Sequence, residues 1–161
     1  EDEIYEYQYN TALIEKYPTQ EDSNIQIFSQ NKKDGKTLEY QLALDNPSST
    51  LLLTESISNA NEIEELMNML NQKSVDDMLE RLYDSMENNR IKTAIQKSKW
   101  EDYEKKKAII ASRYLNSVGK GENALELASL LKDNLLLKGT DGYKEFIIPD
   151  YILNAIKWVC K

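Results

Sequence analysis

The sequence predicts a mainly α-helical protein with a small α/β portion. Apolar residues recur every three or four positions through most of residues 61–159, which is typical of helices with one buried face. Only residues 25–29, the segment IQIFS, are rich in apolar residues and flanked by polar residues in the way of a β-strand. A single strand does not make a sheet, so we expect its partner strands to lie upstream, in a longer protein.

The composition is typical of one soluble domain. The chain has 161 residues, of which 40% are hydrophobic and 30% charged. No apolar run approaches the roughly 20 residues of a membrane span, and the acidic N-terminus does not resemble a signal peptide. The chain begins with Glu1 rather than Met, and we expect it to be a piece of a longer protein. A single cysteine, Cys160, predicts a reducing, cytoplasmic location.

The absence of histidine restricts the chemistry. It excludes Ser-His-Asp and Cys-His nucleophiles and histidine zinc sites, and one cysteine excludes a thiolate zinc site. Catalysis would therefore use carboxylates, Lys, Tyr and a hard cation such as Mg²⁺ or Mn²⁺.

Charge is unevenly distributed along the chain. The net charge is −8, yet residues 88–120 contain nine basic and three acidic residues. Four of these lysines are expected to face outward from a long helix: Lys97, Lys99, Lys105 and Lys106. Clustered lysines of this kind suit contacts with DNA phosphates, and a solvated helix face is the alternative.

In the first third of the chain, Thr37 is predicted to cap a short helix over residues 38–44, which ends before Asn46-Pro47. Residues 51–53, three leucines, suit either a buried strand or the start of a helix. A turn is expected over residues 139–142.

The remainder is predicted to be helical. One helix starts at Asn61, and another, capped by Ser74 and Asp77, continues through Met86. A long helix covers residues 91–117, with buried positions at Trp100, Tyr103, Ala111, Tyr114 and Leu115. The next helix buries Ala124, Leu127, Ala128 and Leu131. Pro149 is the first residue of a terminal helix that buries Ile152, Ala155, Ile156 and Val159.

Two short motifs could carry chemistry. In the first, Thr37 and Glu39 place a hydroxyl and a carboxylate just after the predicted strand, where a divalent cation could bind. In the second, Lys120 lies between two glycines at a helix N-terminus, a position that favours anions. Each motif also has a plain structural explanation, as a helix cap or as a helix–helix connection.

Together the motifs resemble one family. The strings KTLEYQLAL at 36–44, GKGENALELA at 119–128 and IPDYILNAI at 148–156 occur in the order seen in OLD-family (overcoming lysogenization defect) ATP-dependent endonucleases. They look like the C-terminal part of the TOPRIM nuclease domain. The resemblance covers about residues 25–160 and implies three parts: residues 1–54 associated with the TOPRIM sheet, a helical insertion over 55–118, and C-terminal TOPRIM helices over 119–161.

The resemblance also implies roles. Glu39 matches a metal-binding glutamate of the family, Thr37 its hydroxyl neighbour, and Lys120 the lysine expected to stabilise the transition state. It implies DNA cleavage with Mg²⁺ or Mn²⁺, a homo-oligomeric parent protein and a function such as phage defence. ATP would bind only in a separate domain of the parent, because this chain has no Gly-x-x-x-x-Gly-Lys-Ser/Thr motif.

The sequence departs from the family pattern in one respect. The family's early glutamate and its Asp-x-Asp motif are not convincingly present, so we expect the active site of this chain to be incomplete and inactive by itself. The alternative is a non-catalytic α-helical protein-interaction module, whose exposed helices bind a partner protein. The nuclease interpretation requires Glu39 and Lys120 to share one surface, although 80 residues separate them in the sequence.

Overall fold

The computed structural model describes residues 25–30 and 36–160, with the side chain of Lys120 excepted. In these ranges the fold is mainly helical, as predicted, and consists of seven α-helices and a 3-10 turn without any β-strand. The elements follow in the order α2 (Leu38–Asp45), η1 (Thr50–Leu52), α3 (Ala60–Met69), α4 (Val75–Arg81), α5 (Met86–Lys97), α6 (Asp102–Leu115), α7 (Lys120–Leu136) and α8 (Asp150–Val159).

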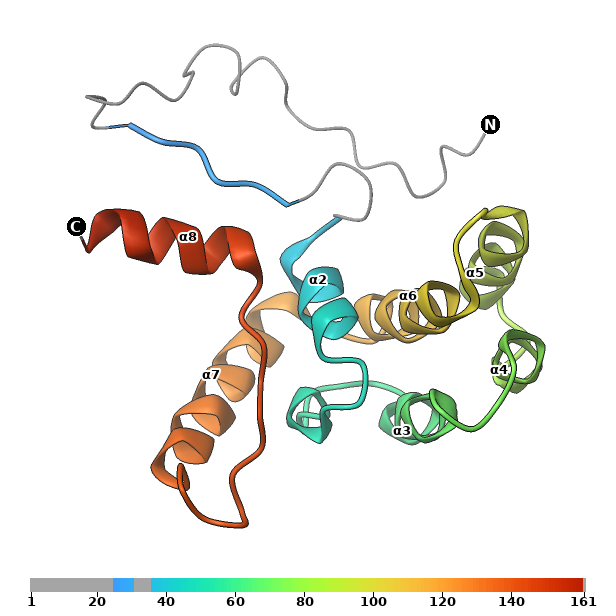
Figure 1. Ribbon diagram of the computed structural model, residues 1–161. Coiled ribbons are helices and arrows are strands. Elements are labelled where there is room, and N and C mark those ends of the chain that lie inside the picture. The colour runs from blue at the N-terminus through green and yellow to red at the C-terminus, as the bar shows by residue number, and fades with distance from the viewer. Residues whose placement is uncertain (1–24, 31–35, 161) are drawn as a thin grey trace.

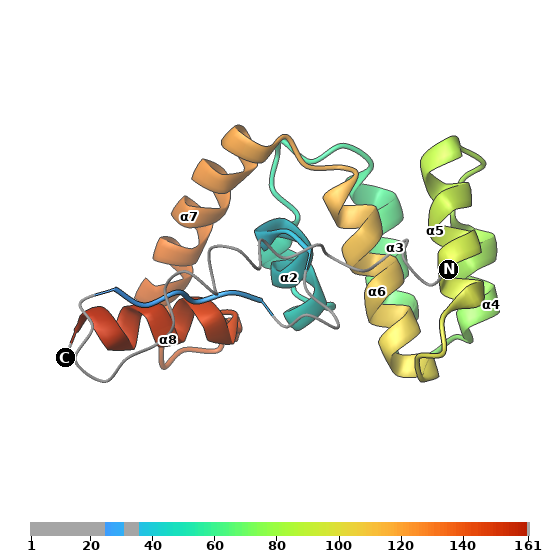
Figure 2. The ribbon, with the colours of Figure 1, turned by 90° about the horizontal axis from the view of Figure 1, so that it is seen from above.

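Helix α6 is the centre of the fold. It packs against α2, α3, α4 and α5, and Figure 2 shows α2 between this helical group and the pair α7 and α8. Ile109, Ile110 and Tyr114 of α6 are fully buried, together with Tyr40 of α2 and Ile95 of α5. Burial of such large apolar side chains is the main stabilising contribution to a fold of this size.

Local capping explains where several helices begin. The Thr37 hydroxyl accepts a hydrogen bond from the Tyr40 N–H, and Ser74 and Asp77 form a reciprocal capping box at α4. Both caps confirm the sequence prediction. The start predicted at Asn61 is wrong, because α3 begins at Ala60 after Asn59, which adopts the left-handed conformation with φ of 58°.

The predicted long helix over residues 91–117 is wrong, because the chain breaks between α5 and α6. Ser98 turns to an extended conformation, and its hydroxyl and N–H both return to carbonyl groups at the end of α5. Trp100 lies in the connection and is half-buried, whereas Tyr103 is 52% exposed rather than inward-facing.

The predicted continuation of the preceding helix to Met86 is also wrong. Helix α4 ends at Arg81, and residues 82–85 form a connection in which Tyr83 is exposed. Ser85 then caps α5 by accepting a hydrogen bond from the Asn88 N–H.

The strand predicted at residues 25–29 is not formed. Residues 25–30 instead run extended beside α8 (Figure 1), and the Phe28 and Trp158 rings lie 6.2 Å apart. The three leucines at residues 51–53 belong to η1 and the residue after it, not to a strand. The α/β portion therefore has no counterpart in the described residues.

The last two helices are less buried than predicted. In α7 only Leu127 of the four predicted positions is fully buried, Leu131 is half-buried, and Ala124 and Ala128 are exposed. Helix α8 has no fully buried residue, and Ile156 is 51% exposed. Pro149 is the N-cap of α8, one residue before the predicted place. The turn at residues 139–142 is confirmed, and Gly139 supplies its positive φ of 91°.

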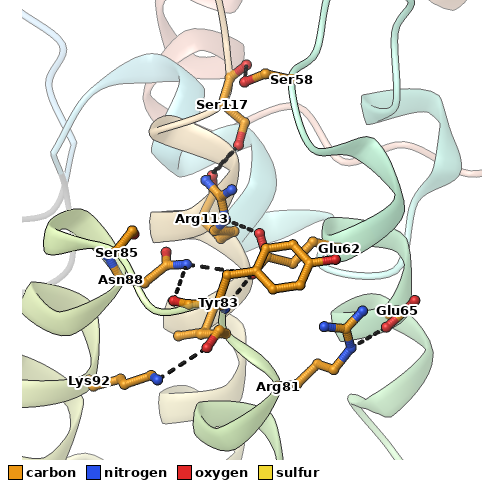
Figure 3. A network of polar contacts seen from close by, with 11 residues as sticks. Ser58, Glu62, Glu65, Arg81, Tyr83, Ser85, Asn88, Lys92, Arg113 and Ser117 are labelled. Atoms are coloured by element: carbon orange, nitrogen blue, oxygen red, sulfur yellow. Dashed lines mark hydrogen bonds and ion pairs between the residues drawn. The ribbon is translucent and has the colours of Figure 1, made fainter.

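A buried ion pair joins α3 to α6. The Arg113 Nε donates to the Glu62 Oε2 at 2.5 Å, and both side chains are almost inaccessible to solvent. The other oxygen of Glu62 accepts the backbone N–H of Tyr83, and Arg113 also donates to the Ser117 hydroxyl. Figure 3 shows Glu62 at the middle of this network, reached from the α4–α5 connection and from α6.

Replacing Glu62 by Gln should destabilise the protein by about 3–5 kcal/mol, because Arg113 would stay buried without its counter-charge. Urea unfolding followed by circular dichroism measures this change. The control is Glu65→Gln, which breaks the exposed Glu65–Arg81 pair and should have a much smaller effect. Equal effects of the two substitutions would contradict the importance of the buried pair.

Candidate functional site

The first candidate motif lies in the first turn of α2. The Thr37 hydroxyl is engaged as the N-cap, and Glu39 is half-buried in the turn that follows. A carboxylate in this position is stabilised by the positive end of the helix dipole. The capped first turn of α2 therefore presents the Glu39 side chain from a fixed part of the backbone.

The second candidate motif forms the start of α7. Gly119 is the N-cap, Lys120 is the first helical residue, and no side chain of the cap residue closes the first turn. A Cβ atom added at Gly119 or Gly121 would meet no other atom within 4 Å. The space beside both residues is open, which suits the approach of an anion to the N–H groups of this helix end.

Tyr114 of α6 contacts the first turn of α7. Its hydroxyl is 3.1 Å from the Oδ1 of Asn123, in the first turn of α7, and Asn123 in turn donates to the Thr54 hydroxyl at 2.7 Å. Burial raises the pKa of Tyr114 to about 12, the Asn123 hydrogen bond opposes the rise, and the Glu39 carboxylate adds to it. Because α2 also packs against α6, the helix that carries Glu39 and the start of α7 are both attached to α6.

A second contact fixes the same end of α7. The Glu126 carboxylate accepts the backbone N–H of Ser56 at 2.9 Å, and the hydrogen bonds of Ser56 lower the pKa of Glu126. The N-terminal half of α7 is therefore attached both to α6 and to the segment after η1.

The four lysines predicted to bind DNA lie in or before the N-terminal part of α6, whereas Tyr114 lies at its C-terminal end. Lys97 and Lys99 are exposed, at the end of α5 and in the connection, and Lys105 and Lys106 are half-buried in the first turns of α6. Between Lys106 and Tyr114 the helix rises about 12 Å. The lysines therefore do not form one continuous helical path to Lys120, as a single long helix would have allowed.

A metal site cannot be completed from the described residues. Within residues 25–30 and 36–160 there is no group of three or more His, Cys, Asp or Glu side chains that could hold a metal ion. Glu39 offers the hard oxygen donors that Mg²⁺ and Mn²⁺ prefer, but a carboxylate of this kind needs further ligands.

A cavity beside α2 was not predicted from the sequence. A cavity of about 670 Å³ lies between α2, α6, α8 and the segment at residues 25–30. Tyr40 and Trp100 line it, together with Asp45, whose pKa is raised mainly by burial. No local sequence signal predicts this cavity, because it depends on how segments more than 100 residues apart come together.

Asn46 is the residue that brings these distant segments together. Its side chain accepts the Ile147 N–H at 2.6 Å and donates to the Ile147 carbonyl at 2.9 Å. The residue was predicted only as the end of a short helix, and its long-range function has no signature in the sequence.

No protein family, curated protein or solved structure matches this chain. Among the described residues, no helix is long and apolar enough to cross a membrane. The roles of Thr37, Glu39 and Lys120 therefore remain predictions from the resemblance, and the contacts around Tyr114 are the structural basis on which they can be judged.

Replacing Tyr114 by Phe should destabilise the protein by about 1–3 kcal/mol, because the buried Asn123 oxygen loses its donor. The pH dependence should change as well. An unfolded tyrosine ionises near its ordinary pKa of 10, whereas native Tyr114 stays protonated to about pH 12. Raising the pH from 10 to 12 therefore favours the unfolded state.

Chemical denaturation at several pH values measures this contribution. The free energy of unfolding should fall more steeply between pH 10 and 12 in the wild type than in Tyr114→Phe. Parallel curves for the two proteins would show that Tyr114 is not protected in the native state.

Proposed function

We propose that this chain is part of a DNA endonuclease that depends on Mg²⁺ or Mn²⁺, a TOPRIM nuclease of the OLD-like type. The observation that supports the proposal is that α6 links the two motifs, which lie 80 residues apart in the sequence. Helix α6 packs against α2, whose first turn carries Glu39, and its Tyr114 hydroxyl donates to Asn123 in the turn that begins with Lys120.

In this proposal each residue has a distinct task. Glu39 provides one carboxylate for a divalent cation, and Thr37 fixes the helix turn that presents it. When bound, the cation would polarise the scissile phosphate and the attacking water. Lys120, at the open N-terminus of α7, neutralises the charge that develops on the phosphate oxygens. The other acidic ligands would come from parts of the protein outside the described residues.

The wider context is proposed on the same basis. DNA would contact Lys97, Lys99, Lys105 and Lys106 through its backbone phosphates, without sequence preference. The parent protein would be a cytoplasmic homo-oligomer that binds ATP in a separate domain and acts in a process such as phage defence.

The second candidate function is a non-catalytic protein-interaction module. It is favoured by the apolar side chains that α7 and α8 leave exposed. Leu125 is 77% exposed, Leu136 78% and Val159 74%. An apolar surface of this kind commonly marks a contact with another protein part.

The test is nicking of supercoiled DNA with Mg²⁺ or Mn²⁺ by the longer protein that contains this chain. Glu39→Ala should abolish cleavage, and Lys120→Ala should lower its rate by roughly 100-fold or more. Glu64→Ala and Lys138→Ala, which remove exposed charges elsewhere, should cleave at the wild-type rate.

Circular dichroism of each variant shows whether it is folded. Cleavage that survives both Glu39→Ala and Lys120→Ala would remove these residues from the mechanism. A folded protein that cleaves no DNA under any metal condition would favour the interaction module.

A further inference from the structure

The cavity beside α2 is large enough for a small-molecule ligand. Its volume is about 670 Å³, and pockets for ligands of this class range over roughly 300–1,000 Å³. Four aromatic side chains line it: Phe28, Tyr40, Trp100 and Tyr151. Tyr40 is 1% exposed, and the other three are half-buried. The rings give a ligand an apolar surface against which its body can pack.

Three carboxylates from three different helices line the same cavity. Asp45 is the last residue of α2, Glu104 lies in the first turn of α6, and Asp150 begins α8. None of the three forms an ion pair with a described residue. Lys107 is the one basic residue among the described residues of the lining, so negative charges outnumber positive ones by three to one. This excess of negative charge favours a cation over an anion.

Asp45 is the least exposed of the three carboxylates. Its Oδ1 accepts a hydrogen bond from the Gln41 side-chain amide at 2.9 Å. No described residue donates to its Oδ2, which is not one of the buried side-chain atoms without a partner and so keeps access to solvent. Burial is the main reason why the pKa of Asp45 is raised. A cation that entered the cavity would stabilise the charged form of this partly desolvated carboxylate.

We propose that this cavity binds an organic cation, a molecule with an ammonium or guanidinium group on an aromatic or aliphatic body. The charged group would lie near Asp45 and Glu104, and the body would pack on the aromatic rings, whose faces also attract cations. The carboxylates belong to separate helices, and among the described residues no three acidic side chains are gathered closely enough to hold a metal ion. An extended cation therefore matches them better than a metal does. This inference does not rest on the proposed nuclease function.

Tryptamine is the first probe, because it joins a protonated amine to an aromatic body. Isothermal titration calorimetry of the 161-residue chain at constant ionic strength should show saturable binding. Two matched molecules change only the end group, since tryptophol has a neutral hydroxyl and indole-3-acetate a carboxylate. Tryptophol should bind roughly tenfold more weakly than tryptamine, and indole-3-acetate more weakly still. Equal binding of the three molecules, or no binding of tryptamine, would overturn the cation site.

Substitutions in the lining locate the charged group. Asp45→Asn should weaken tryptamine binding roughly tenfold and leave tryptophol binding unchanged, because only the amine depends on the negative charge. Glu104→Gln should weaken tryptamine binding roughly threefold. The matched control is Asp133→Asn, which removes one exposed carboxylate of α7 outside the cavity and should bind tryptamine as the wild type does.

Circular dichroism shows whether each variant is folded. If Asp45→Asn does not fold, Glu104→Gln decides the test, because its side chain is exposed. Unchanged tryptamine binding in the folded lining variants would overturn the site. An equal loss of binding in Asp133→Asn would do the same, because it would indicate a general effect of the protein's net charge.

The cation has two possible sources, a free amine or a basic side chain of a polypeptide. A capped tryptophanyl-arginine amide, titrated beside its glutamine counterpart, distinguishes them. Tighter binding of the arginine peptide than of tryptamine would assign the cavity to a basic side chain, and tighter binding of tryptamine to a free amine. Equal binding of the arginine and glutamine peptides, with no binding of tryptamine, would reject an organic cation as the ligand.

Discussion

The ion pair between Glu62 and Arg113 is the constraint on which the rest of the fold depends. Two opposite charges are buried together, so removal of either one would leave the other buried without a counter-charge. Glu62 also accepts the N–H of Tyr83, which fixes the connection where α4 ends and from which Ser85 starts α5. One carboxylate thus determines the position of α6 against α3 and the direction of α5. Because α6 is the central helix, this ion pair also fixes the helix against which the elements of the candidate site pack.

Successive residues of α6 serve different neighbours. Adjacent side chains of a helix point about 100° apart, so Arg113 and Tyr114 point in different directions. Arg113 joins the buried network with Glu62 of α3, and Tyr114 binds Asn123 of α7. Because α2 also packs on α6, this single helix fixes the positions of α2 and of the start of α7 relative to each other. A site supported by one packed helix keeps its geometry better than a site on separate loops.

Structural features that depend on residues a few positions apart were predicted correctly from the sequence. Features that depend on residues far apart in the sequence were not. The caps at Thr37 and Ser74 are confirmed because each involves groups three positions apart. The breaks at residues 82–85 and 98–101 were missed because apolar spacing continues across both, and because the first depends on Glu62, some 20 residues away. The segment at residues 25–29 has the apolar pattern of a strand, yet the same pattern suits an extended segment covering α8. At the candidate site, the motifs were visible in the sequence, whereas the Tyr114–Asn123 contact could be seen only in the fold.

The central claim is that α6 connects Glu39 of α2 with the start of α7, through its packing against α2 and through the Tyr114–Asn123 hydrogen bond. Its most direct test is the pKa of Tyr114, measured by ¹³C magnetic resonance of labelled tyrosine in the wild type, Glu39→Gln and the exposed control Glu64→Gln. Removing a nearby negative charge favours the ionised tyrosine, so the pKa of about 12 should fall in Glu39→Gln and stay unchanged in Glu64→Gln. An identical Tyr114 pKa in all three proteins would place Glu39 away from the α6–α7 junction and contradict the account.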